Sequence, residues 1–245
     1  MKAIILAAGR GSRMHKATGD RPKGLVEVAG KALLDRQIAS LRLAGIEEIA
    51  AVIGYRGDQI ATRPLTTFTN SRWAETNMVA SLTCAAEWLR SGPCLVSYSD
   101  IFYRPEAPKA LMAATADISV TFDPNWLTLW AKRADDPLGD AETFRLGPDG
   151  GLTAIGARPM SLAEVEGQYM GLLRFTPTGW AAVERLLESL PAERRDRLDM
   201  TSMLSGLLER GQPVQAIAAP WPWGEVDTES DLALYDSDPA AFGLD

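Results

Sequence analysis

The first half of this 245-residue chain alternates apolar strands with helices, and this alternation limits the folds that it can adopt. Apolar runs at 2–7, 48–54 and 93–100 have the length and composition of buried strands. Between them, residues 31–45 and 77–90 show the apolar spacing of helices. Strands joined by helices require right-handed crossovers. The pattern therefore predicts an α/β fold, with a mainly parallel, doubly wound, Rossmann-like sheet that has helices on both faces.

The second half of the chain has a different pattern. From residue 123 to 175, strands and turns predominate, with a hairpin-like turn at 146–151 and a strand at 167–175. We interpret this segment as a small strand-rich lid within a single domain that spans residues 1–245. Because ligands of open parallel sheets bind beyond the carboxyl ends of the strands, we expect the site at that edge, beneath the lid.

Composition argues against several classes of function. The formal net charge is −7, so the chain lacks the cationic footprint of a protein that binds nucleic acid. Its two cysteines, Cys84 and Cys94, form no metal-binding or disulfide pattern, which fits a reducing cytoplasm. No run of about 20 apolar residues could span a membrane, and the N-terminal run is too short for a signal-peptide core. We expect a cytoplasmic protein whose partners are small molecules.

A loop with little side-chain bulk follows the first strand. It reads "LAAGRGSRM" and is followed at a distance by "RPKGL". Small residues let backbone amides approach an anion closely, so a phosphate group is the expected ligand. The loop lacks the Gly-Lys-Ser/Thr ending of a Walker A loop, and Met14 stands where a dinucleotide-binding loop has its third glycine. The alternative is an ordinary glycine-rich turn whose Arg and Lys face water.

The two halves of this motif resemble the signature of the nucleotidyltransferase superfamily, which activates sugar phosphates and choline phosphate. The resemblance continues over essentially the whole chain and is weakest at 123–165. It implies that the loop binds a nucleoside triphosphate and that Arg13 and Lys23 are catalytic. A guanidinium can fork onto phosphate oxygens, and an ammonium can act as a point charge at the α-phosphate. The loop residues implied in nucleotide binding are Leu6, Ala7, Ala8, Gly9, Gly11, Ser12, Arg13 and Lys23.

Within the superfamily, the chain is most similar to the short branch that includes phosphocholine cytidylyltransferases. The segment "NSRWAETNMVASL" carries this similarity and implies that Asn77 and Ser81, one helical turn apart, face the base of CTP. Asn77 could also be a helix cap, which is compatible with a base contact. Gly54 and Tyr55 match the end of the second strand of the family and join the nucleotide-binding set.

The resemblance also implies a magnesium site. Asp100 in "SYSDIFY" matches the metal-binding acid after a strand, and Asp227 in "GEVDTESDLALY" matches the acid before the last helix. Carboxylate oxygens are ligands that Mg²⁺ prefers, although an aspartate in such a position could instead cap a helix. On a strand, Glu225 would share a face with Asp227, and we assign it to the acceptor side as a helper.

Nucleotidyl transfer needs little acid–base catalysis. The attacking oxygen of a phosphate or phosphonate is already anionic near neutral pH, so the obstacle is repulsion between anions. Cations and aligned backbone amides reduce this repulsion by stabilising the negative charge of the phosphates. The only histidine, His15, is therefore interpreted as a loop residue and not as a base.

The sequence defines the acceptor less well. Each aromatic face can attract a quaternary ammonium by about 0.5–2 kcal/mol, which makes phosphocholine the first candidate, although these rings could instead belong to the core. The acceptor-binding candidates are Asp123, Trp126, Trp130, Tyr169 and Glu225. Lys132 and Arg133 could bind an acceptor phosphate or face water. Because of these two cations, aminoethylphosphonate, glycerophosphocholine and a phosphorylated amino-acid amide are also possible acceptors.

Two other functions stay open at this point. One is a sugar-1-phosphate nucleotidylyltransferase, and the other is a catalytically inactive, nucleotide-binding regulatory subunit. The presence of Arg13, Lys23, Asp100 and Asp227 argues against an inactive copy.

Overall fold

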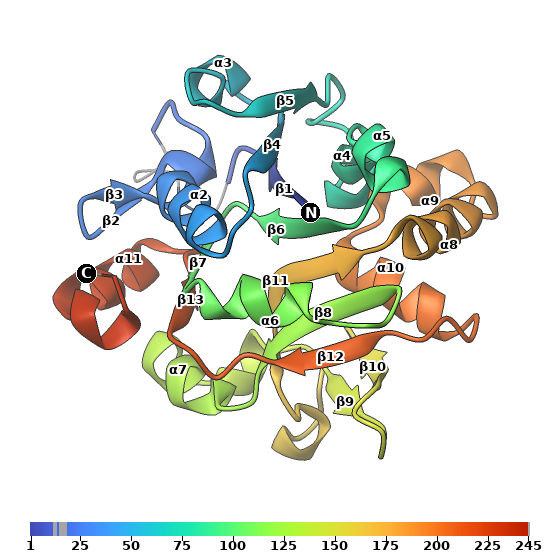
Figure 1. The fold of residues 1–245 in the computed structure, drawn as a ribbon. Helices are drawn as coiled ribbons and strands as arrows, with labels where there is room; N and C mark the ends of the chain where they lie inside the picture. Colours follow the sequence, from blue (N-terminus) through green and yellow to red (C-terminus); the bar gives the residue numbers. More distant parts are fainter. Residues whose placement is uncertain (12–13, 15–18, 245) are drawn as a thin grey trace.

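The computed structural model describes residues 1–11, 14 and 19–244, and its centre is a seven-stranded sheet (Figure 1). The strand order is β12-β8-β11-β6-β1-β4-β5. The strands of this sheet are β1 (Lys2–Ala7), β4 (Glu48–Ile53), β5 (Thr66–Thr69), β6 (Cys94–Tyr98), β8 (Ile118–Asp123), β11 (Gln168–Phe175) and β12 (Gln215–Ala218).

The sheet is mainly parallel, as the sequence predicts. Strand β1 pairs in parallel with both β4 and β6, β5 extends the sheet beyond β4, and β12 is parallel to β8. Only β11 runs the other way, between β6 and β8. The strand–helix alternation explains the parallel part, because each helix returns the chain to the starting edge of the sheet.

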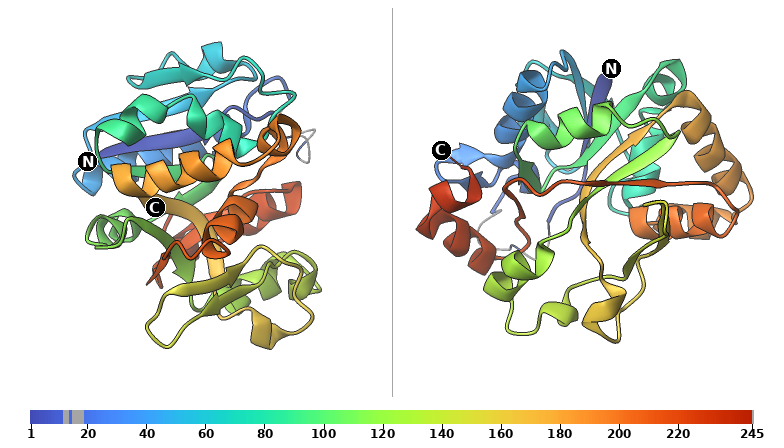
Figure 2. Two further views of the ribbon diagram at one scale, coloured as in Figure 1. Left: turned by 90° about the vertical axis from the view of Figure 1, so that its right-hand side faces the viewer. Right: turned by 60° about the horizontal axis from the view of Figure 1, so that its bottom comes forward.

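Helices cover both faces of the sheet, and the side chains of β1 show why (Figure 2). Its alternate residues, such as Ile4 and Ile5, belong to two separate apolar clusters, so β1 is buried on both sides. The helices are α2 (Leu33–Leu43), α3 (Gly57–Ile60), α4 (Met78–Thr83), α5 (Ala86–Ser91), α6 (Glu106–Met112), α7 (Trp126–Arg133), α8 (Pro177–Glu188), α9 (Ala192–Arg197), α10 (Met200–Leu208) and α11 (Glu229–Ser237). Among the described helices, none has the length and apolar character needed to cross a membrane.

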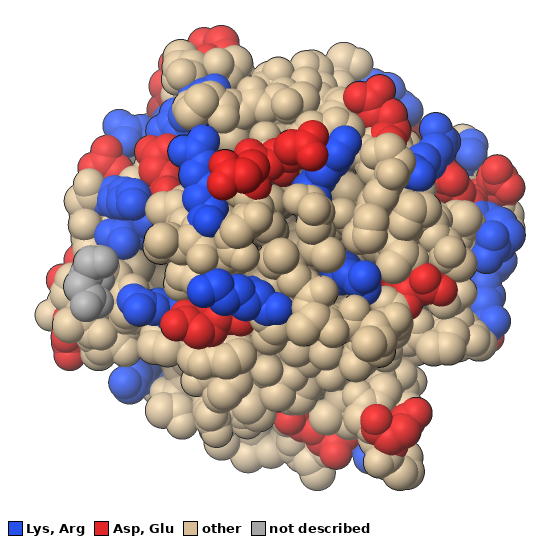
Figure 3. All heavy atoms as spheres, viewed as in Figure 1, with Lys and Arg blue, Asp and Glu red and all other residues tan. Residues whose placement is uncertain are grey.

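The helices divide between the two clusters. Buried residues of α2 and α6 belong to one cluster, and buried residues of α4, α5, α8 and α10 belong to the other. The predicted helix at 77–90 is in fact the two short helices α4 and α5. On the face shown in Figure 3, acidic and basic side chains are interspersed and form no continuous basic surface.

Segment 123–175 is less strand-rich than predicted. It begins with helix α7, continues through the antiparallel hairpin of β9 (Phe144–Leu146) and β10 (Leu152–Ile155), and ends in β11. The hairpin forms around the predicted turn, but β11 belongs to the central sheet. In Figure 2, the part before β11 stands at one end of the sheet. Its role as a lid stays a prediction.

A small two-stranded sheet was not predicted. It joins two segments that are about 120 positions apart in the sequence. Strand β7 (Ile101–Tyr103) pairs antiparallel with β13 (Trp223–Glu225) (Figure 1). The backbone N–H of Val226 then donates to the carbonyl of Asp100, at 2.9 Å. A second small hairpin consists of β2 (Glu27–Val28) and β3 (Lys31–Ala32), and short 3-10 helices occur at Lys23–Leu25, Pro137–Gly139, Leu162–Glu164 and Pro239–Phe242.

Strand β11 contains a bulge that only glycine fits. Between Tyr169 and Leu173 its register with β8 shifts, and Gly171 has φ +72°. A Cβ there would lie 2.7 Å from the ring of Tyr98. We expect Gly171→Ala to lower the free energy of unfolding by about 1–3 kcal/mol, because it adds crowding to backbone strain. Urea unfolding measures this loss.

Gly211→Ala is the matched control. Gly211 has φ +71°, and open space surrounds the position of its missing Cβ, so the substitution costs backbone strain without crowding. If both variants lose the same free energy of unfolding, crowding of the new Cβ against Tyr98 adds nothing to the cost of Gly171→Ala.

Candidate active site

A cavity of about 280 Å³ opens where β1 and β6 end, at the predicted edge of the sheet. The predicted nucleotide-binding residues that line it are Leu6, Ala8, Gly9, Gly11, Lys23, Asn77 and Ser81. Ala7, Gly54 and Tyr55 do not line it. Ser12, Arg13 and His15 lie outside the described residues, so their roles stay predictions.

Two glycines allow close packing around the loop that lines this cavity. Gly11 has φ +73°, and a Cβ on it would lie 2.8 Å from the Cβ of Lys23, so glycine lets the lysine pass close to the loop. A Cβ on Gly54 would lie 2.6 Å from that of Trp73 and 2.7 Å from the carbonyl oxygen of Ala8. The N–H of Tyr55 also donates to that carbonyl, at 2.9 Å. Gly54 and Tyr55 therefore support the loop from behind.

Lys23 joins two carboxylates that are distant in the sequence. Its ammonium donates to Asp100 Oδ2 at 2.7 Å and to Asp227 Oδ1 at 2.5 Å. Burial alone would lower the pKa of Lys23, but the charges and hydrogen bonds of the two aspartates outweigh it and raise the pKa above its ordinary value. The structure thus brings together three residues that the sequence motifs singled out separately.

A buried side chain holds the backbone on both sides of Asp100. It follows β6, and the carbonyls of Tyr98 and Ile101 on either side of it both accept hydrogen bonds from the side-chain amide of Gln37. Gln37 is fully buried on α2. Sequence analysis missed this residue, because a glutamine within a helix is usually a surface residue.

Glu225 completes a cluster of three carboxylates. Oxygens of Asp100, Glu225 and Asp227 lie within 4.8 Å of one another. Burial, followed by repulsion from Asp227 and Asp100, raises the pKa of Glu225 well above its ordinary value. Asp100 Oδ1 is buried and has no hydrogen-bond partner. An all-oxygen donor set with excess negative charge fits a hard divalent cation such as Mg²⁺.

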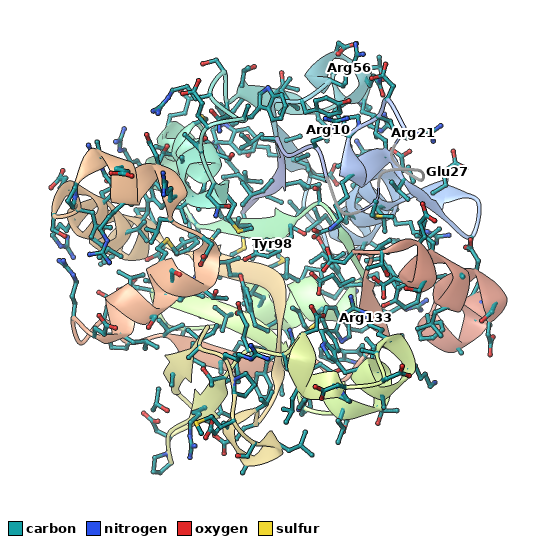
Figure 4. The ribbon with its side chains drawn as sticks, turned by 180° about the vertical axis from the view of Figure 1, so that it is seen from behind. Arg10, Arg21, Glu27, Arg56, Tyr98 and Arg133 are labelled. Carbon is teal, nitrogen blue, oxygen red and sulfur yellow. The ribbon has the colours of Figure 1, made fainter. Side chains whose placement is uncertain are left out.

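A second cavity, of about 310 Å³, adjoins the first. Tyr98 (near the centre of Figure 4), Met78 and Asp227 line both cavities. Two of the predicted acceptor residues, Tyr169 and Glu225, line the second cavity. The other residues that matter for its chemistry are Asp140, Glu142, Gln168, Asp199 and Thr201. Sequence analysis missed them because isolated polar residues, spread from 140 to 201, carry no motif.

The remaining predicted acceptor residues do not line either cavity. Asp123 accepts a hydrogen bond from the indole N–H of Trp223, at 2.9 Å, and is buried. The indole of Trp126 donates to the carbonyl of Val165, and Trp130 packs against Trp223 with 5.9 Å between ring centroids. These side chains form the core beneath α7. The expected aromatic pocket of Asp123, Trp126 and Trp130 is therefore wrong.

Asn77 and Ser81 line the first cavity, but both side chains have protein partners. Asn77 Oδ1 accepts from the N–H of Met78 and caps α4, which was the alternative reading. Ser81 Oγ accepts from the buried side chain of Asn70, at 3.0 Å. Trp73, which no sequence motif indicated, also lines this cavity and packs edge-on against Tyr55. Contact of Asn77 and Ser81 with a base stays a prediction.

Arg133 neither faces water nor reaches an acceptor cavity. Its side chain is 5% exposed, and Nε lies 2.9 Å from Asp231 Oδ1, while Nη1 lies 3.6 Å from Glu225 Oε2 (Figure 4). Lys132 is exposed, with its ammonium 5.6 Å from the ring centroid of Phe242. Neither residue is placed to bind an acceptor phosphate in this structure.

Comparison with known proteins shows a family and close relatives of this chain. Residues 3–158 match the model of the MobA-like NTP transferase domain. The chain is 34% identical over 250 residues to CTP:phosphoglutamine cytidylyltransferase of Campylobacter jejuni, covering 96% of this chain and 98% of that protein.

Two solved structures share the fold. The inositol-1-phosphate CTP transferase from T. maritima has a TM-score of 0.77 at 22% identity, over 99% of this chain and 94% of that one. The CTP:phosphocholine cytidylyltransferase from Streptococcus pneumoniae has a TM-score of 0.70 at 21% identity, over 96% of this chain and 97% of that one.

The raised pKa of Glu225 predicts an unusual pH dependence of stability. In the folded protein, Glu225 keeps its proton at pH values where the unfolded chain, with a pKa near 4.5, has released it. Stability is therefore lost as the pH rises from 4.5 through the raised pKa. In EDTA at about pH 8, Glu225→Gln should have a higher free energy of unfolding than the unmodified protein, because it cannot ionise.

Urea unfolding at several pH values measures the difference between the two proteins. We expect the advantage of the Gln variant to shrink as the pH falls toward 4.5. If Glu225→Gln is equally destabilised at pH 4.5 and at about pH 8, the pKa of Glu225 is not raised in the folded protein. Asp149→Asn, on the exposed β9–β10 turn, is the control for a carboxylate outside the cluster.

Proposed function

Because the chain belongs to the family of MobA-like NTP transferases, we propose that it transfers CMP from CTP to a small phosphorylated acceptor, releasing pyrophosphate. The observation that carries this proposal is the position of Lys23, between two carboxylates and beside a glycine loop that opens into a cavity. The cytidylyltransferase of C. jejuni, which matches over nearly the whole chain, supports CTP as the donor.

The charges in the site suit an attack of one phosphate on another. The triphosphate would lie along the loop from Gly9 to Gly11, where backbone amides are accessible, with its α-phosphate near Lys23. A bound Mg²⁺ would offset part of the phosphate charge. The acceptor phosphate is already ionised near neutral pH, so the site needs no general base. This fits the described part of the cavity, where Lys23 is the cation and no histidine occurs.

Lys23 would change partners during this reaction. In this structure its ammonium pairs with both Asp100 and Asp227. With nucleotide and cation bound, the carboxylates would have another positive partner, and Lys23 could turn toward the phosphate oxygens of the leaving and transferred groups. A side chain at Gly11 would crowd the stem of Lys23, so glycine at this position is compatible with such a movement.

The second cavity is the proposed acceptor site. Its wall contains the carboxylates of Asp140, Glu142 and Asp199, and the buried Oε1 of Gln168 has no hydrogen-bond partner. These groups accept hydrogen bonds, so they favour an acceptor that carries N–H donors. A quaternary ammonium has no N–H to donate, so it would interact with these carboxylates by charge alone and with the aromatic faces of Tyr98 and Tyr169.

An amide-bearing or amine-bearing phosphorylated acceptor therefore fits better than phosphocholine. The name of the C. jejuni relative, a phosphoglutamine cytidylyltransferase, supports the same class. We accordingly prefer a phosphorylated amino-acid amide as acceptor. Phosphocholine, the first candidate from sequence, becomes the comparison compound, and glucose-1-phosphate tests the sugar alternative.

The catalytic role of Lys23 can be tested directly. Lys23→Ala should lower the rate of pyrophosphate release from CTP by about 100-fold or more, because it removes charge stabilisation of the transferring group. Lys132→Ala, which removes an exposed lysine of α7, is the control and should keep its activity. If both variants turn over at the native rate, the loop does not bind the reacting phosphates.

The acceptor class can be tested with a panel. With CTP and Mg²⁺, phosphoglutamine should give a kcat/KM at least about tenfold above that of phosphocholine or glucose-1-phosphate, since its N–H groups can donate to the carboxylates of the wall. Glu142→Gln should raise the KM for phosphoglutamine while leaving that for CTP nearly unchanged. A preference for phosphocholine would move the assignment to a cationic headgroup, and a preference for glucose-1-phosphate would favour the sugar branch.

A further inference from the structure

Helix α7 ends in a buried guanidinium behind the proposed metal site. The side chain of Arg133 is 5% exposed, and its guanidinium lies 4.5 Å from the ring centroid of Trp130. Its Nε and Nη2 donate to the two carboxylate oxygens of Asp231, at 2.9 and 3.3 Å. The side chain of Asp231 is 4% exposed, so this forked ion pair is removed from water.

Asp231 connects the arginine to Asp227. Its Oδ2 accepts hydrogen bonds from the backbone N–H groups of Asp227 and Thr228, both at 2.9 Å. Asp231 is also the third residue of α11, and it takes part in the capping box at Thr228. The turn that carries Asp227 is therefore held by a carboxylate whose own position depends on Arg133.

The same guanidinium also faces Glu225. Nη1 of Arg133 lies 3.6 Å from Glu225 Oε2, and this nitrogen has no hydrogen-bond partner. One side chain thus contacts the Glu225–Asp227 segment at two points, directly at Glu225 and through Asp231 at Asp227. Buried ion pairs often add little to stability compared with apolar residues of the same size, so fold stability alone does not account for this arrangement.

We propose that Arg133 is a positioning residue, which keeps the carboxylates of Glu225 and Asp227 directed toward a divalent cation. This inference rests on the metal site in the proposed function. Partners of this kind, behind the metal ligands, orient them and tune the affinity for the ion. The lobe that begins with α7 would in this way be coupled to the metal site without contributing a ligand.

Binding of Mn²⁺, followed by electron paramagnetic resonance in the absence of CTP and acceptor, tests the proposal without turnover. Arg133→Met should weaken Mn²⁺ binding by about 10- to 100-fold, as is typical when a ligand loses its supporting partner. Arg133→Lys keeps a positive charge near Glu225 and Asp231 but cannot fork onto Asp231. Its affinity for Mn²⁺ should therefore lie between those of the unmodified protein and Arg133→Met.

Arg174→Met is the matched control. Arg174 is 8% exposed in β11 and donates to the carbonyl of Ala116, at 2.8 Å, so its loss also removes a buried arginine. We expect this variant to lose thermal stability but to bind Mn²⁺ with native affinity. Thermal unfolding of all variants reports the structural cost separately from the metal affinity.

The outcomes separate the two proposals. Native Mn²⁺ affinity in a folded Arg133→Met or Arg133→Lys protein would overturn the positioning role and leave the metal site intact. If Arg133→Met does not fold, the Lys variant decides the question. If the unmodified protein itself binds no Mn²⁺, both the metal site and the role of Arg133 are refuted. A loss of affinity as large in Arg174→Met would likewise refute a specific role for Arg133.

Discussion

The site depends on the attraction between one ammonium and two carboxylates. Lys23 pairs with Asp100, 77 positions later in the chain, and with Asp227, 204 positions later. The β7–β13 pairing and the hydrogen bond from Val226 to Asp100 bring those carboxylates together. Without a cation between them, their repulsion would oppose that pairing. Burial, followed by repulsion from Asp227 and Asp100, raises the pKa of Glu225, which fits a cluster in which one ammonium lies beside three carboxylates.

The strands of the first half of the chain could be predicted because their residues are apolar on both faces, and β1, β4 and β6 are confirmed. The glycine motif and the two aspartate motifs were recognisable from sequence because each needs specific residues at short spacing. Helix α7 was missed, although Trp126, Leu129 and Trp130 have helical spacing, because a three-residue pattern between turn signals is ambiguous.

The predictions that the structure contradicts share a physical cause. A tryptophan that packs in the core and one that binds a cation have the same local sequence, so the aromatic pocket could not be distinguished from the core beneath α7. The partners of Arg133 could not be predicted either, because Glu225 and Asp231 are more than ninety positions away in the sequence. Long-range pairing decides whether such a charge is buried or solvated, and only the folded chain shows it.

The antiparallel direction of β11 has a consequence for how such proteins can diversify. Because β11 pairs with β8 in the opposite direction, Gln168 lies beside Asp123, and the intervening residues leave and rejoin the sheet at one edge. An insertion or deletion there disturbs no strand pairing of the central sheet and costs little in chain entropy. The segment can therefore change in length or sequence while β1 and β6, and the turns after them that carry Lys23 and Asp100, stay unchanged.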